Sequence, residues 1–81
     1  MKINERNKMT FPQLWKDLRQ TEMRDVRREI QEGLRKDRAT FWRWYKGDKT
    51  PSSFAEKQMF ANIINRVLGI QTTPDTLFPK Q

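Results

Sequence analysis

The sequence predicts an all-α fold, a compact bundle of four to five helices in one domain. Apolar residues recur at spacings of three and four in several segments, which is the period of an amphipathic helix. Each of these segments opens at a residue type that caps helices, and glycine ends two of them. The connections between segments are short, as they are in compact helical domains. A chain of 81 residues suits a single domain with a small core.

The first predicted helix begins after Thr10 and runs to about Arg19 or Gln20. Thr10 and Gln13 have the spacing of a capping box, in which each side chain binds the backbone of the other residue. Residues 1–8 are polar, and we expect them to form a flexible tail ahead of a domain over residues 9–79. The apolar stripe of this helix consists of Phe11, Leu14, Trp15 and Leu18.

The second predicted helix is capped by Thr21, with Glu22 close to its positive end. One face is apolar and the other is dense in charge, so most of its acidic and basic pairs are solvated. Residues 35–37 are polar and predict a turn. The apolar positions of this helix are Met23, Val26, Ile30 and Leu34.

A short third helix over residues 38–46 follows this turn. Asp37 is a good N-cap, and Gly47 supplies the left-handed conformation that stops a helix. Ser53 and Glu56 have capping-box spacing and open the longest helix, whose apolar positions are Phe60, Ile63, Ile64, Val67 and Leu68.

The chain after this longest helix is short. Gly69 ends the helix, and Thr73 with Pro74 favours one last helical turn. We expect the segment Leu77-Phe78-Pro79 to fold back on the bundle.

The composition argues against an enzyme. The chain has neither cysteine nor histidine, so thiolate or imidazole metal ligands, thiol nucleophiles and imidazole acid–base catalysis are all missing. We therefore expect no catalytic residue, no cofactor and no metal, and no small-molecule ligand is evident. No apolar run is long enough for a membrane span or a signal peptide, so a cytoplasmic location is expected.

The charge predicts a polyanionic partner. The net charge is +7, and residues 1–49 hold fourteen Lys and Arg against eight Asp and Glu. A basic half beside a nearly neutral half favours one face that binds nucleic acid.

Residues 38–50 carry the functional prediction. On a helix Phe41 and Trp44 point together toward the core, which leaves a basic outward face. Such a helix fits the major groove of DNA, where arginine binds guanine bidentately and lysine meets phosphates. The segment reads Arg38-Ala39-Thr40-Phe41-Trp42-Arg43-Trp44-Tyr45-Lys46-Gly47-Asp48-Lys49-Thr50.

The order of motifs resembles small bacterial helix-turn-helix domains of the lambda-repressor/Cro type. Those domains have an opening Phe-x-x-Leu-Trp helix, a Thr-Phe-x-x-Trp-x-x-Gly recognition helix and a final Leu-Phe-Pro. The matching pieces here begin at Phe11, Thr40 and Leu77. The resemblance implies duplex DNA as the partner and a role as a transcriptional regulator or mobile-element accessory protein. The DNA-binding residues it implies, together with the reasoning above, are Arg38, Ala39, Thr40, Trp42, Arg43, Lys46 and Lys49.

The first helix of the helix-turn-helix departs from the family pattern of alanine, glycine and a small apolar residue. Keeping the family spacing to Phe41 places Gln31, Arg35 and Lys36 at these positions. Aligning Gly33-Leu34 with the glycine–apolar pair gives a longer turn, and we prefer it because it buries Leu34 rather than Lys36. It places Glu29 where alanine is expected.

Competing interpretations remain for single residues and for the function. Trp42 either contacts DNA or a second copy, or packs sideways against a neighbouring helix. The alternative function is a protein-interaction adaptor that has lost DNA binding, with Trp42 and Tyr45 exposed to its partner. RNA binding ranks lower, because the chain has no strands for a stacking platform. A homodimer on paired half-sites would increase specificity, through either the longest helix or the segment Leu77-Phe78.

Overall fold

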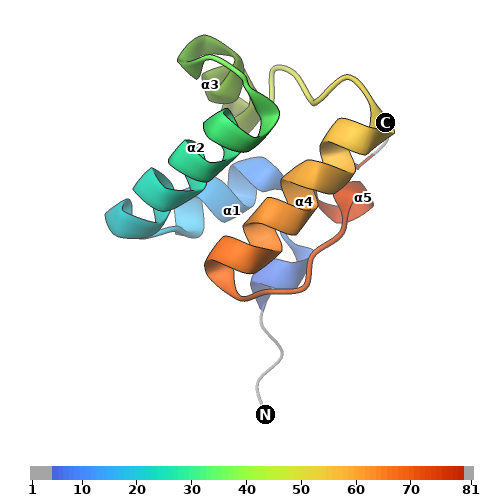
Figure 1. Cartoon of the computed structure of the whole chain (residues 1–81). Helices are drawn as coiled ribbons and strands as arrows, with labels where there is room; N and C mark the ends of the chain where they lie inside the picture. The colour runs from blue at the N-terminus through green and yellow to red at the C-terminus, as the bar shows by residue number, and fades with distance from the viewer. Residues whose placement is uncertain (1–4, 80–81) are drawn as a thin grey trace.

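The computed structural model describes residues 5–79, and within this range the fold is all helical, as predicted. In Figure 1, α2 and α4 lie side by side, α1 passes behind them, and α3 lies at the end where α2 finishes. The elements in chain order are the 3-10 helix η1 (Glu5–Lys8) and the α-helices α1 (Phe11–Asp17), α2 (Gln20–Leu34), α3 (Arg38–Lys46), α4 (Phe54–Leu68) and α5 (Pro74–Leu77).

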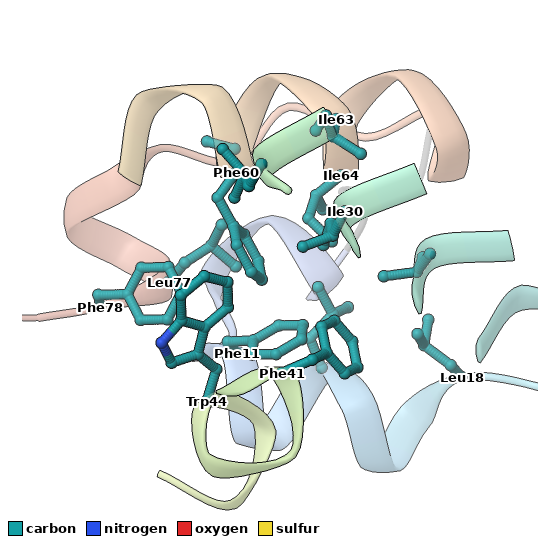
Figure 2. Close-up of a cluster of buried hydrophobic side chains, with 14 of the residues drawn as sticks. Phe11, Leu18, Ile30, Phe41, Trp44, Phe60, Ile63, Ile64, Leu77 and Phe78 are labelled. Atoms are coloured by element: carbon teal, nitrogen blue, oxygen red, sulfur yellow. The ribbon is translucent and has the colours of Figure 1, made fainter. Parts of the chain in front are cut away.

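The core is built around the fully buried ring of Phe11. Its centroid lies 4.6 Å from that of Phe60 on α4 and 5.9 Å from that of Phe41 on α3, both edge to face. Phe78, which follows α5, lies 6.0 Å away, so the C-terminal segment folds back on the bundle as predicted. Figure 2 shows these rings converging from four segments. Because edge-to-face rings pack well, this cluster fixes the positions of α1, α3 and α4 relative to one another.

The boundary between α1 and α2 differs from the prediction. The first helix ends at Asp17, and α2 begins at Gln20, before the predicted cap Thr21. Glu22 explains the shift, because its Oε1 accepts a hydrogen bond of 2.9 Å from the backbone N–H of Arg19. Arg19 therefore takes the N-cap position that the sequence assigns to Thr21.

The predicted flexible tail is ordered over residues 5–8. Its Arg6 guanidinium lies 2.9 Å from the Asp17 carboxylate and 2.8 Å from the Glu22 carboxylate. The Oδ1 atom of Asn7 accepts a hydrogen bond of 2.8 Å from the backbone N–H of Gln71. These contacts attach η1 to the domain, and residues 1–4 lie outside the described residues.

The ion pair between Arg6 and Glu22 predicts a loss of stability in acid. Hydrogen bonding from Arg6, and then from Arg19, lowers the pKa of Glu22 from 4.5 to about 2. A carboxyl with a depressed pKa stabilises the fold above pH 4.5, and this contribution is lost as the pH falls toward 2. Both side chains are partly exposed, so we expect a contribution of about 1 kcal/mol. Glu22→Gln keeps a capping oxygen without the charge.

Urea unfolding at a series of pH values measures this effect. The Glu22→Gln variant should be less stable than the wild type at neutral pH and should lose less stability between pH 5 and 2. Equal acid dependence in the two proteins would contradict the assignment to Glu22.

The later boundaries agree with the sequence predictions. Asp37 caps α3, Gly47 ends it with φ 86°, and Gly69 ends α4 with φ 66°. The N–H of Glu56 donates a hydrogen bond of 3.1 Å to Oγ of Ser53, the cap of α4. The last turn, α5, begins after Thr73, whose Oγ1 accepts a hydrogen bond from the N–H of Thr76.

The residue that ends α2 is Arg35, with φ 53° and ψ 47°, in the left-handed region. This conformation costs about 1–2 kcal/mol in a residue with a Cβ atom. Glycine avoids that cost. Its greater flexibility in the unfolded chain, however, cancels about 0.5–1 kcal/mol of the stabilisation gained. We expect Arg35→Gly to stabilise the fold by about 0.5–1 kcal/mol in thermal or urea unfolding. Arg35→Ala is the control, because it removes the same side chain but keeps the strained backbone. Equal stability of the two variants would contradict the explanation.

Candidate nucleic-acid interface

Helix α3 is held on the domain by two buried aromatic side chains, Phe41 and Trp44. The Phe41 ring lies 5.1 Å from that of Trp15, and the Trp44 ring lies 5.6 Å from that of Phe60. The sequence prediction that both residues belong to the core is therefore confirmed. Because two rings one turn apart are fixed, α3 presents a constant outward face.

The N-terminus of α3 is capped by its own chain. Oδ1 of Asp37 accepts a hydrogen bond of 2.8 Å from the N–H of Thr40. Hydrogen bonding from Thr40, first from its side chain and then from its backbone, lowers the pKa of Asp37 below its ordinary value. Thr40 is half buried, and its N–H is used in the cap. The Thr40 side chain also faces Asp37, so a ligand at this end of the helix would compete with the cap for it.

The outward face of α3 is basic, and within residues 5–79 only the Asp37 carboxylate at its N-terminus acts on this charge, through space on Arg43. Arg38, Arg43 and Lys46 are exposed, and Ala39 lies between them. Within residues 5–79, no carboxylate forms an ion pair with these three cations. The six ion pairs of this region lie elsewhere, so α3 keeps its positive charge available to an anion.

Lys49 is placed beside the C-terminal end of α3 by the loop after Gly47. The backbone N–H groups of Asp48 and Lys49 donate to the carbonyl oxygen of Arg43, at 3.0 and 3.4 Å. The Cβ atom of an alanine at Gly47 would lie 3.4 Å from Cγ of Pro12, so the loop also touches α1. The structure thus brings all seven predicted DNA-binding residues onto α3 and the loop that folds over its end.

Trp42 is exposed to 45%, and Nζ of Lys46 lies 4.4 Å from its ring centroid. Trp42 is not among the half-buried side chains that pack against the core, which favours an exposed ring over packing against a neighbouring helix. Tyr45 is half buried, and its ring stacks on that of Trp15 at 4.8 Å. It therefore lacks the exposure expected of a residue at the centre of a partner surface.

An open groove of about 410 Å³ adjoins this surface on α2. Trp15, which stacks on Tyr45, forms one wall. Arg24 and Arg27 line the groove, and no carboxylate within residues 5–79 forms an ion pair with either. Arg28, by contrast, is paired with Asp25 at 3.5 Å. The other lining residues are Gln20, Thr21 and Met23.

A signal in the sequence distinguishes these arginines. Arg24 and Arg27 have no acidic residue three or four positions away on their helix, whereas Arg28 has Asp25 and Glu32. The prediction of a face dense in solvated ion pairs on this helix missed this difference. The same test identifies Arg43, which also lacks an acidic neighbour at helical spacing.

The connection between α2 and α3 consists of residues 35–37. The burial on either side of it is the one expected from aligning Gly33-Leu34 with the glycine–apolar pair. Leu34 is buried, whereas Nζ of Lys36 lies 3.0 Å from the Glu56 carboxylate. Gly33 lies where α2 meets α4, and a Cβ atom there would approach Cδ1 of Ile63 to 2.8 Å. Close approach of the two helices therefore accounts for a glycine in the last turn of α2.

Comparisons of the chain with protein-family models, with curated protein sequences and with solved structures give no match. Over residues 5–79, no helix has the length and apolar character to cross a membrane. The same residues contain no cluster of three or more acidic side chains that could hold a metal ion.

Proposed function

We propose that the chain binds duplex DNA with α3 in the major groove, as a small transcriptional regulator or a mobile-element accessory protein. In this proposal α2 and α3, with the connection at residues 35–37, act as a helix-turn-helix. Arg38 and Arg43 contact base edges, and Lys46 and Lys49 contact phosphates. The side chain of Thr40 contacts the sugar-phosphate backbone of the DNA, and the small side chain of Ala39 leaves room for a base.

One observation carries the proposal: the outward face of α3 has three cations without carboxylate partners within residues 5–79. Residues 38–47 contain no acidic residue, so these three cations lie together on one face without a carboxylate of their own helix among them. A basic face on a helix whose other side is fixed in the core has the shape and charge that a major groove requires.

The groove on α2 supports the same proposal. Arg24 and Arg27 supply two more cations beside the ring of Trp15, which touches Tyr45 on α3. We assign them to phosphates that flank the groove occupied by α3. Together with Lys46 and Lys49 they make the contact mainly electrostatic.

Exposed Trp42 favours the second candidate, a protein-interaction adaptor. An exposed tryptophan beside arginines is typical of a binding hot spot. In the DNA proposal the same ring lies against a thymine methyl group or a sugar. The two candidate functions differ in the partner that the purified protein would bind, which is duplex DNA in the first and another protein in the second.

A selection of the purified protein against a random duplex library at moderate salt tests the proposal. We expect an enriched motif and an affinity that falls steeply with salt. About six neutralised phosphates correspond to a log–log slope near −5. Failure to retain any duplex at low salt would contradict DNA binding and favour the adaptor.

A further inference from the structure

A pocket of about 250 Å³ opens where the loop after α3 meets the C-terminal segment. Leu77 and Phe78 form one wall and are themselves buried, so this segment is not the dimer surface that the sequence allowed. Pro12 of α1 and Gly47 at the end of α3 line the pocket as well. We name it the Trp44 pocket, after the largest side chain in its walls. The walls come from segments far apart in the chain, so no local pattern in the sequence predicts the pocket.

The side chain of Trp44 brings a polar group to this apolar site. It is 3% exposed, and its Nε1–H donates no hydrogen bond within residues 5–79. The nitrogen is still accessible, because in that range Oγ1 of Thr72 is the only fully buried polar side-chain atom without a partner. Figure 2 shows the nitrogen on the edge of the indole that faces away from Phe11 and Phe41. Because a buried tryptophan N–H ordinarily has an acceptor, this donor suits a bound molecule that supplies one.

The charge at the pocket is positive. Lys49 is the only charged residue that lines it, and this lysine forms no ion pair within residues 5–79. An outer hollow of about 380 Å³ shares Lys49 and Phe78 with the pocket and adds Asp48 and Lys57. Lys57 is half buried, and Asp48 pairs with neither lysine. Both hollows therefore carry one net positive charge, which suits one anionic group.

We propose that the Trp44 pocket binds a small aromatic monocarboxylate. The ring of the ligand lies against Leu77 and Phe78, and its carboxylate accepts the Nε1–H of Trp44 and pairs with Lys49. The flexible stem of lysine lets its ammonium group reach into the pocket from the rim. Hydrogen bonds to an ionised acceptor are stronger than those to a neutral one. The site therefore selects the acid over an alcohol of the same shape.

The size and charge of the pocket decide the class of ligand. Most ligand sites have volumes of about 300–1,000 Å³, so this pocket suits a molecule with a single ring. A phosphate group carries a charge of about −1.5 to −2 at neutral pH, whereas the lining supplies one cation. The hydroxyl groups of Thr10 and Thr50, which also line the pocket, are further donors for a carboxylate.

Lys49 connects this pocket to the DNA-binding surface. In the proposed function, on which this step rests, Lys49 contacts a phosphate. A carboxylate bound to the same ammonium group neutralises it, so ligand and DNA compete. Loss of one phosphate contact should lower the affinity for DNA about fivefold at moderate salt and reduce the log–log salt slope by about 1.

Nuclear magnetic resonance of the indole N–H groups tests the site without DNA. The chain has three tryptophans and thus three indole signals, and contacts with the Phe60 ring identify that of Trp44. Titration with phenylacetate should move this signal downfield and saturate, with a dissociation constant on the order of 1 mM because few atoms make contact. 2-Phenylethanol, which has the ring without the charge, and acetate, which has the charge without the ring, should shift it much less. No saturable shift with phenylacetate, or an equal shift with 2-phenylethanol, would overturn the proposal.

Lys49→Gln tests the cation at an exposed position. It should weaken phenylacetate binding about threefold to tenfold, because one charged hydrogen-bonding partner is lost. Lys16→Gln makes the same change at an exposed position of α1 that lines neither hollow, and it should bind like the wild type. Equal affinities of the two variants for phenylacetate would contradict the role of Lys49.

A titration of duplex DNA at constant salt tests the competition. Saturating phenylacetate should weaken DNA binding by the wild type and leave binding by Lys49→Gln unchanged, because that variant already lacks the contact. A wild type that binds phenylacetate and DNA without competition would contradict the connection through Lys49. A chain that binds phenylacetate at Trp44 but retains no duplex would contradict the proposed function and leave the pocket assignment standing.

Discussion

Replacing Arg43 by glutamate should abolish retention of duplex DNA. The side chain is exposed at the middle of the outward face of α3 and has no carboxylate partner within residues 5–79. One bidentate contact to a base contributes about 1–3 kcal/mol, and the new carboxylate would add repulsion from phosphates. The combined effect is at least about 100-fold in affinity at moderate salt. Titration of a selected duplex, followed by fluorescence anisotropy, measures it.

Arg66→Glu is the matched control for this experiment. It makes the same change of charge at an exposed position in the last turn of α4 and removes only a surface ion pair with Glu29. We expect DNA binding close to the wild type, apart from a small effect of total charge. If Arg43→Glu bound DNA as well as Arg66→Glu does, α3 would not be the helix that enters the groove.

Most of the fold could be predicted from local signals. The caps Asp37 and Ser53 and the stop at Gly47 were correct because each acts within one turn of its helix. The start of α2 was wrong because Thr21 and Arg19 are both compatible with the local pattern. The choice depends on Glu22, which binds the Arg19 backbone and Arg6 at the same time. A contact across sixteen positions leaves no periodic signal in the sequence.

The candidate site also has one part that could be predicted from local sequence and another that depends on tertiary contacts. The outward face of α3 follows from helical spacing once Phe41 and Trp44 are placed in the core. The groove on α2 does not, because it depends on Trp15 of another helix forming its wall. Exposure of Trp42 was left open for the same reason, since only the tertiary structure decides whether a neighbouring helix covers it.

The largest loss of stability should come from Phe11→Ala. The Phe11 ring is fully buried and lies within about 6 Å of four other aromatic rings, those of Trp15, Phe41, Phe60 and Phe78. Removing it leaves a cavity among groups from four segments, and such changes cost about 3–5 kcal/mol. Small domains have a total stability of about 5 kcal/mol or slightly more, so the variant should be largely unfolded near body temperature.

Phe54→Ala removes the same atoms from an exposed position and serves as the control. Because the Phe54 side chain is 66% exposed, we expect a change within about 0.5 kcal/mol in urea unfolding at a concentration where the chain is monomeric. Circular dichroism should show a cooperative transition for Phe54→Ala and little helix for Phe11→Ala. A small loss of stability in Phe11→Ala would mean that the neighbouring rings collapse into the vacated space. The core would then depend on total apolar volume, and the edge-to-face contacts around Phe11 would not be what holds α3 against α1.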